Sequence, residues 1–236
     1  MGSVTESFDA SLDERVRLAA RGLASAGLVH AFGHCSARIN QRQFLVCAAM
    51  PMGLINDETG TVVAIDGPLP ENVLGEVRAH QAIYAARHDV GGICRIMSPA
   101  VMALSTAGIT PAARHGLGAY FAPRPPFWND PRLLRDDALA VKLASALGQA
   151  RAIVMRANGA ITVGRNIEEA TAFAFFLEDA GRVERDIRSM GFDPSKGLLS
   201  DDEIRARQTL AGGVIDRAWR WLTTTSPSGS QQGDRS

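Results

Sequence analysis

Glu76 and His80 stand four residues apart in a stretch whose apolar residues keep helical spacing. In a helix, this spacing places two side chains one turn apart on the same face. A glutamate oriented by an imidazole can take or give a proton, which is general acid–base catalysis. The ordinary alternatives are a surface carboxylate at position 76 and a histidine that satisfies the core at position 80. The pair therefore marks a candidate proton-transfer site.

Glycines accompany two further histidines. His34 follows Gly33 in an expected loop, where its ring can bond a carboxylate or hydroxyl of a substrate. His115 lies in the irregular segment 110–126 and is followed by two glycines, which let a backbone approach a ligand closely. His115 is thus a candidate proton donor, against the alternative of an ordinary loop histidine. Tyr120 in the same segment can form part of an aromatic wall for a planar substrate, although packing also explains an aromatic residue there.

Composition limits the function classes. The chain has 236 residues, 46% of them apolar and 21% charged, which is typical of a globular protein. The net charge is zero, which argues against nucleic acid or an anionic membrane as the main partner. We see neither an apolar run long enough to span a bilayer nor a secretory signal. We therefore expect a cytoplasmic protein that acts on a small molecule.

The cysteines are three, an odd number, and show no C-x-x-C spacing. This pattern predicts reduced, buried thiols. A catalytic role for Cys35 or Cys94 is the alternative, because both flank segments of the candidate site.

Hydrophobic periodicity and turn residues predict alternating strands and helices. Such alternation is typical of an α/β/α layered domain, here a single domain over residues 1–225 followed by a disordered tail over 226–236. We expect helices at 12–26, 70–87, 99–107, 129–147, 166–190 and 201–221, and strands at 44–47, 61–65, 91–97, 152–156 and 160–163.

Five motifs occur along the chain in an order typical of one known family. Residues 33–38 read Gly-His-Cys-Ser-Ala-Arg, and residues 75–84 contain Glu76, His80 and a final Ile-Tyr pair. Ser-Pro at 98–99, Pro-Pro at 125–126 and Asn-Gly through Val-Gly at 158–164 complete the set. Together they resemble the class II aldolase/adducin family over residues 12–190. Histidine at position 34 is similar to the branch whose members decarboxylate hydroxylated aromatic or pyridine carboxylic acids.

This resemblance implies a fold, an assembly and several residue roles. The fold is the three-layer α/β/α sandwich of the class II aldolase type. The assembly is a homotetramer with its active site near a subunit interface. Glu76 would shuttle a proton at the reacting carbon. Ser36 and Arg38 would help His34 bind an anion, with a structural ion-pair role as the alternative for Arg38.

The same resemblance draws attention to three replaced residues. In the family, the first segment usually reads His-x-His-Ser-Pro and the second His-Gly, and these three histidines hold a divalent cation. Here the positions are Arg95, Met97 and Asn158. Arginine has no lone pair to donate, a thioether suits copper(I), and an amide carbonyl is a weak ligand. We therefore expect no metal and no other cofactor.

Arg95 would place a fixed positive charge near the position of the family's cation. A guanidinium can bind a carboxylate through two hydrogen bonds and stabilise developing negative charge. We predict a metal-independent carbon–carbon lyase, either a decarboxylase or a retro-aldolase, acting on a small hydroxylated aromatic carboxylic acid. An isomerase, cyclase or hydrolase using the same pocket, and an inactive ligand-binding or scaffolding homologue, are the alternatives. The candidate catalytic residues are Glu76, Arg95 and His115; the candidate substrate-binding residues are His34, Ser36, Arg38, His80, Asn158 and Tyr120.

Overall fold

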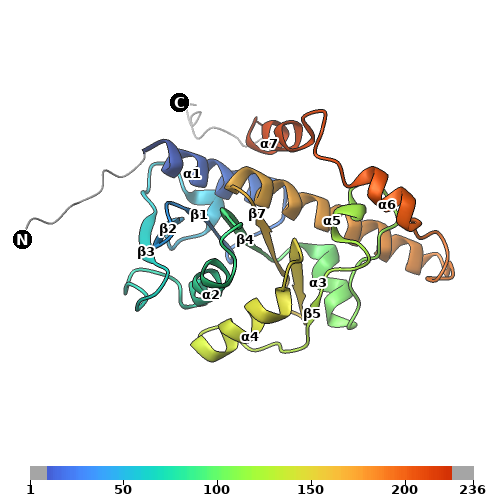
Figure 1. Cartoon of the computed structure of the whole chain (residues 1–236), viewed down its shortest axis with the longest axis horizontal. Coiled ribbons are helices and arrows are strands. Elements are labelled where there is room, and N and C mark those ends of the chain that lie inside the picture. The colour runs from blue at the N-terminus through green and yellow to red at the C-terminus, as the bar shows by residue number, and fades with distance from the viewer. Residues whose placement is uncertain (1–9, 225–236) are drawn as a thin grey trace, which may run out of the picture.

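A mixed seven-stranded sheet crosses the centre of the molecule in the computed structural model, which describes residues 10–224 (Figure 1). The strand order is β3-β2-β1-β4-β7-β6-β5. Neighbouring strands run antiparallel except for β5 and β6, which are parallel. The strands are β1 (His34–Arg38), β2 (Gln43–Val46), β3 (Thr61–Ala64), β4 (Gly92–Ile96), β5 (Phe127–Trp128), β6 (Ala152–Met155) and β7 (Ala160–Gly164).

Helices cover both faces of this sheet. In Figure 1, α1, α5 and α7 lie on one side of the strands, and α2 and α4 lie on the other. Each side has its own apolar cluster, so the predicted three-layer α/β/α fold is confirmed. The helices are α1 (Ala10–Ser25), α2 (Arg78–Ala86), α3 (Pro99–Thr106), α4 (Asp137–Leu147), α5 (Ile167–Ser189), α6 (Asp201–Arg207) and α7 (Val214–Thr224), with short 3-10 turns η1 (Met52–Leu54), η2 (Gly75–Val77) and η3 (Gly118–Phe121).

The central strand β4 shows how the two clusters divide. Side chains alternate between the two faces of a strand. Ile93 packs in the cluster under α2, whereas Cys94 and Ile96 pack in the cluster under α5. Arg95 therefore faces the α2 side. The three cysteines are free and buried, as predicted. Within residues 10–224, we find no helix with the length and apolar character needed to cross a membrane.

Two predicted helices begin later than expected. The helix predicted at 129–147 begins at Asp137, because Asp130 accepts a turn hydrogen bond from the Arg132 amide and Asp136 caps the helix at the Leu139 amide. The helix predicted at 70–87 begins at Arg78, preceded by η2, because Leu74 is extended with ψ of 133°. Both errors come from turn chemistry that interrupts an apolar pattern.

Two further expectations are wrong. The helix predicted at 201–221 is two helices, α6 and α7, separated by Gly212 and Gly213 with φ of 72° and 67°. The expected loop at 33–38 is strand β1, which lies between β2 and β4. The tail predicted at 226–236 lies outside the described residues. The other predicted helices and strands are present, with ends shifted by a few residues.

Candidate active site

Strand β1 brings two polar side chains under helix α2. His34 Nδ1 lies 3.0 Å from His80 Nε2, and His80 Nδ1 lies 2.7 Å from Ser36 Oγ. Ser36 Oγ lies 3.0 Å from the Tyr84 hydroxyl, which donates to the Ser36 carbonyl at 3.1 Å. All four side chains are buried. They form one hydrogen-bonded chain that runs from the core to His34.

Both histidines of this chain are held neutral. Burial, together with the charge of Arg95, lowers the pKa of His80 to about 3. Burial, His80 and Arg95 hold the pKa of His34 well below its usual value. The hydrogens along the chain can be ordered in either direction, which leaves His34 Nε2 as an N–H donor or as an acceptor. Among residues 10–224, this buried atom has no hydrogen-bond partner, so a bound substrate can supply one.

Arg95 is fixed at the end of β4 by the β6–β7 hairpin. Gly159 in that hairpin has φ of 70°, and a Cβ there would lie 2.0 Å from the Ile96 carbonyl oxygen, so only glycine permits this approach. Arg95 Nη1 donates to the Ile96 carbonyl and Nη2 donates to Asn158 Oδ1, both at 2.7 Å. Arg95 Nε and Asn158 Nδ2 are buried and have no partner among the described residues.

Glu76 lies between this arginine and the segment before α4. Its Oε2 is 4.0 Å from Arg95 Nη2, and its Oε1 accepts from the Leu134 amide at 3.3 Å. The side chain of Glu76 is 20% exposed, whereas that of Arg95 is 3% exposed. Glu76 thus sits at the boundary between a buried cation and solvent, where a carboxyl group can exchange protons with a ligand.

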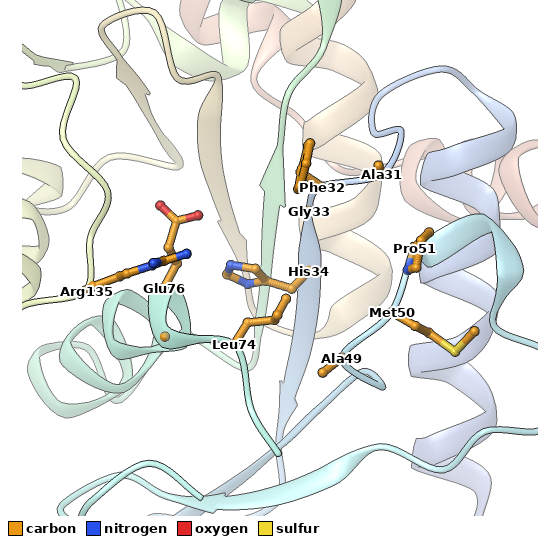
Figure 2. Close-up of a pocket in the computed structure, with 11 residues that line it drawn as sticks. Ala31, Phe32, Gly33, His34, Ala49, Met50, Pro51, Leu74, Glu76 and Arg135 are labelled. Atoms are coloured by element: carbon orange, nitrogen blue, oxygen red, sulfur yellow. The ribbon is translucent and has the colours of Figure 1, made fainter. Parts of the chain in front are cut away.

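A cavity of about 270 Å³ opens in front of these residues. Figure 2 shows the ring of His34 directed toward Glu76 and Arg135, with apolar side chains around it. Of the predicted site residues, only His34 and Glu76 line this cavity, while Arg95, His80 and Asn158 lie behind them. The lining residues are Ala31, Phe32, Gly33, His34, Ala49, Met50, Pro51, Leu74, Gly75, Glu76 and Arg135.

Arg135 is a cavity residue that we did not predict from the sequence. Its segment was expected to be helical, and an arginine among charged neighbours gives no distinctive pattern. The apolar wall formed by Phe32, Met50 and Leu74 was missed for a related reason. Residues of loops come together only after the sheet has formed, and no periodicity links them.

Three predicted site residues lie away from the cavity. Tyr120 packs on Phe176 in the cluster under α5, on the other face of the sheet. His115 Nδ1 is 3.8 Å from Asp179 Oδ2 of helix α5. Arg38 donates to the backbone carbonyls of Tyr84, Arg87 and Val90 rather than facing an anion. Within one chain, these side chains are not part of the candidate site, and Ser36 contributes only through the buried chain to His34.

The site does not suit the divalent cation of the expected family. Of the three positions that would hold it, Arg95 is a buried guanidinium bonded to Asn158, and the third is the thioether of Met97. A fixed cation in this place repels a metal ion, and amide and thioether groups are poor ligands for zinc or manganese. In the part of the chain that is described, no group of three or more His, Cys, Asp or Glu is placed to hold a metal ion.

Comparisons with known proteins agree with the fold. The model of the Class II Aldolase and Adducin N-terminal domain matches residues 14–184. A 3,4-dihydroxyphthalate decarboxylase from Terrabacter sp. is 26% identical over 224 residues, which cover 86% of this chain and 89% of that protein. Alpha-adducin from Rattus norvegicus is 26% identical over 198 residues, which cover 77% of this chain and 26% of adducin.

A solved structure gives the same result for the backbone. The L-fuculose 1-phosphate aldolase from Glaciozyma antarctica PI12 superposes with a TM-score of 0.77 at 22% identity, and the match covers 95% of this chain and 93% of the aldolase. At this identity the likeness shows the fold alone.

Proposed function

This chain belongs to the class II aldolase and adducin family, and from that premise we propose that it is a carbon–carbon lyase that works without a divalent cation. The preferred reaction is decarboxylation of a small hydroxylated aromatic carboxylic acid. The observation that carries the proposal is the pair Glu76 and His34, which share one cavity backed by the buried charge of Arg95. The relative named as a 3,4-dihydroxyphthalate decarboxylase supports the same reaction class.

The walls of the cavity favour an aromatic substrate over a sugar phosphate. Most of the lining is apolar, including Phe32, Met50, Pro51 and Leu74, and no lining residue carries a hydroxyl group. Polar side chains occur only at one end, as His34, Glu76 and Arg135. A polyhydroxylated ligand would leave many hydroxyls unpaired in such a cavity, whereas a flat ring with polar groups on one edge would not.

The chemistry then follows from the positions of the polar groups. Glu76 in its acid form gives its proton to the ring carbon that bears the carboxylate. The bond to the carboxylate breaks, carbon dioxide leaves, and the bonding electrons return to the ring. Glu76 is left as a carboxylate 4.0 Å from Arg95 Nη2, where its new negative charge is stabilised. A proton from water restores the acid, and His34 Nε2 holds a hydroxyl or carboxylate oxygen of the substrate throughout.

Retro-aldol cleavage is the second reaction that this arrangement supports. Here the broken carbon–carbon bond leaves an electron pair on carbon, and Glu76 is placed to protonate that carbon. Apolar exposure at the mouth of the cavity supports the expected homotetramer. Phe32 there is 67% exposed and Leu74 is 40% exposed. Apolar side chains exposed in this way favour contact with another copy of the chain.

Turnover by the wild type and by two matched variants tests the proposal. Carbon dioxide release would be measured on a panel of hydroxylated aromatic acids that includes 3,4-dihydroxyphthalate. We expect Glu76→Gln to lower kcat by about 1,000-fold, because the amide cannot donate the required proton. Glu71→Gln, at an exposed carboxylate of the same segment, should keep the wild-type rate.

The result that contradicts the proposal is a Glu76→Gln variant that turns over as fast as Glu71→Gln. A ligand that saturates the cavity and is returned unchanged by the wild type would instead favour a binding or scaffolding homologue. The similarity to alpha-adducin makes that outcome a specific alternative.

A further inference from the structure

Among the described residues 10–224 that line the cavity, Arg135 has the one cationic side chain. It comes from the irregular segment between β5 and α4, next to Leu134, whose amide binds Glu76 Oε1. The residue is exposed to solvent. Figure 2 draws its side chain on the same side of the cavity as that of Glu76. The same short segment therefore positions the candidate acid and supplies a cation.

The aliphatic part of the Arg135 side chain lies close to Gly75. A Cβ placed on Gly75 would lie 3.3 Å from Arg135 Cγ and 3.7 Å from its Cδ. A larger residue at position 75 would therefore push against the aliphatic part of Arg135. The absence of a side chain at Gly75 thus leaves room for the stem of Arg135 at the cavity wall.

The guanidinium of Arg135 is available to a ligand. Within residues 10–224, we find no hydrogen bond or ion pair from its side chain, although nearby Arg78 pairs with Asp137 and Arg132 pairs with Asp130. Among the described residues it forms no ion pair with Glu76, whose two oxygens are directed to Arg95 and to the Leu134 amide. An unpaired guanidinium on a cavity wall is suited to bind a carboxylate with two parallel hydrogen bonds.

We propose that Arg135 selects substrates that carry a second carboxylate beside the one that reacts. This inference rests on the proposed function and names the substrate class of the same site. One carboxylate lies by His34 and Glu76, and the other lies against Arg135 at the same end of the cavity. Glu76 connects the two positions, because one of its oxygens faces Arg95 and the other accepts from the amide of Leu134, the neighbour of Arg135. Aromatic acids with adjacent carboxylates match this arrangement.

Binding of phthalate and benzoate, measured by calorimetry, tests the inference without any turnover. We expect the wild type to bind phthalate about 10-fold more tightly than benzoate, which is the value of one charge-assisted hydrogen-bonded pair. Arg135→Ala should reduce this preference to about 2-fold or less, and Arg135→Glu should reverse it. Arg132→Ala, which removes an exposed arginine three positions earlier, should leave the preference unchanged.

Gly75→Ala provides an independent check of the same geometry. It should lower the preference for phthalate over benzoate, because it displaces the stem of Arg135. Equal binding of the two ligands by the wild type, no binding of either, or a full preference in Arg135→Ala would overturn the inference. Since no step depends on catalysis, failure of the lyase assay with a retained preference would sink the proposed reaction and leave the role of Arg135 intact.

Discussion

Two buried clusters of polar groups, one on each face of the sheet, differ in how completely they are hydrogen-bonded. Under α5, Glu184 accepts from Arg114 Nε and Arg188 Nε at 2.7 Å and from the Ala112 amide at 3.2 Å. Under α2, the atoms His34 Nε2, Arg95 Nε and Asn158 Nδ2 have no partner among the described residues. Buried polar groups are normally paired, so a cluster of unpaired ones next to a cavity indicates a ligand site. In this comparison the fully paired carboxylate of Glu184 holds the fold, and the unpaired atoms beside the cavity are open to a ligand.

The α5 side also shows what a purely structural carboxylate does. Glu178 is buried and accepts from the amides of Ala100 and Val101 at the start of α3. It therefore takes the capping role that the Ser98 side chain does not fill. Pairing on this face is incomplete elsewhere, because Ser98 Oγ, His115 Nε2 and Glu168 Oε2 are buried without a partner in the described part of the chain.

Removing the fully hydrogen-bonded carboxylate of Glu184 should produce the largest loss of stability. Glu184→Ala leaves Arg114 buried with no counter-charge, since the Arg114 side chain is 2% exposed. We expect the free energy of unfolding to fall by about 3–5 kcal/mol, the usual cost of breaking a buried ion pair on one side. Urea unfolding measures this change. Asp186→Ala, at an exposed position of the same helix, should cost about 0.5 kcal/mol or less, and an equal loss in both variants would remove the contrast.

The corresponding change on the α2 side should act on the rate. Arg95→Ala removes the charge beside Glu76, and we expect kcat to fall by about 100-fold to 1,000-fold, equivalent to about 2.7–4 kcal/mol. Arg95→Lys keeps a charge but loses the planar guanidinium that holds Asn158. Its kcat should therefore lie between those of the wild type and Arg95→Ala. Circular dichroism checks that each variant folds. Wild-type turnover in folded Arg95→Ala would show that this buried cation has no part in the reaction.

Acid should weaken the α2 side through its neutral histidines. The pKa of His80 is about 3 in the folded chain, whereas an ordinary imidazole has a pKa near 6.5 when unfolded. Between these values the unfolded chain binds a proton that the folded chain does not. The free energy of unfolding contributed by His80 is thus fully present above about pH 6.5 and decreases as pH falls, by about 1.4 kcal/mol per unit.

Urea titrations at about pH 7 and about pH 5 measure this dependence. His80→Gln should reduce it, because the variant has no imidazole to protonate at this position, whereas His34 still contributes. His30→Gln, at an exposed histidine, should keep the wild-type dependence. Identical slopes in all three proteins would mean that His80 binds protons equally in the folded and unfolded chains, which contradicts a lowered pKa.

The fold could be predicted from the sequence where periodicity is strong. Helix α5 and the hairpin of β6 and β7 were found within a few residues, because long amphipathic or apolar runs determine them. Strand β1 was missed, because its residues are polar on the face that carries His34 and Ser36. That polarity is the functional feature itself, and it conceals a buried strand from a test based on apolar alternation.

The site was predictable only in part, for a similar reason. Glu76, His80 and Arg95 are recognisable from motifs within single segments. Arg135 depends on contacts between two loops, which no local pattern encodes. His115 was favoured by its glycine neighbours, yet the fold places it against Asp179 on the other face of the sheet. Local chemistry identifies candidate groups, and the topology of the sheet decides which of them share a cavity.

The most direct test of the central claim combines metal content with activity on one preparation of the purified protein. Elemental analysis would give the amount of zinc, manganese and other divalent metals per chain, and carbon dioxide release would be followed before and after treatment with a chelator. Our account predicts turnover with far less than one metal ion per chain and an unchanged rate after chelation. A stoichiometric metal, or activity that the chelator abolishes and added metal restores, would contradict it.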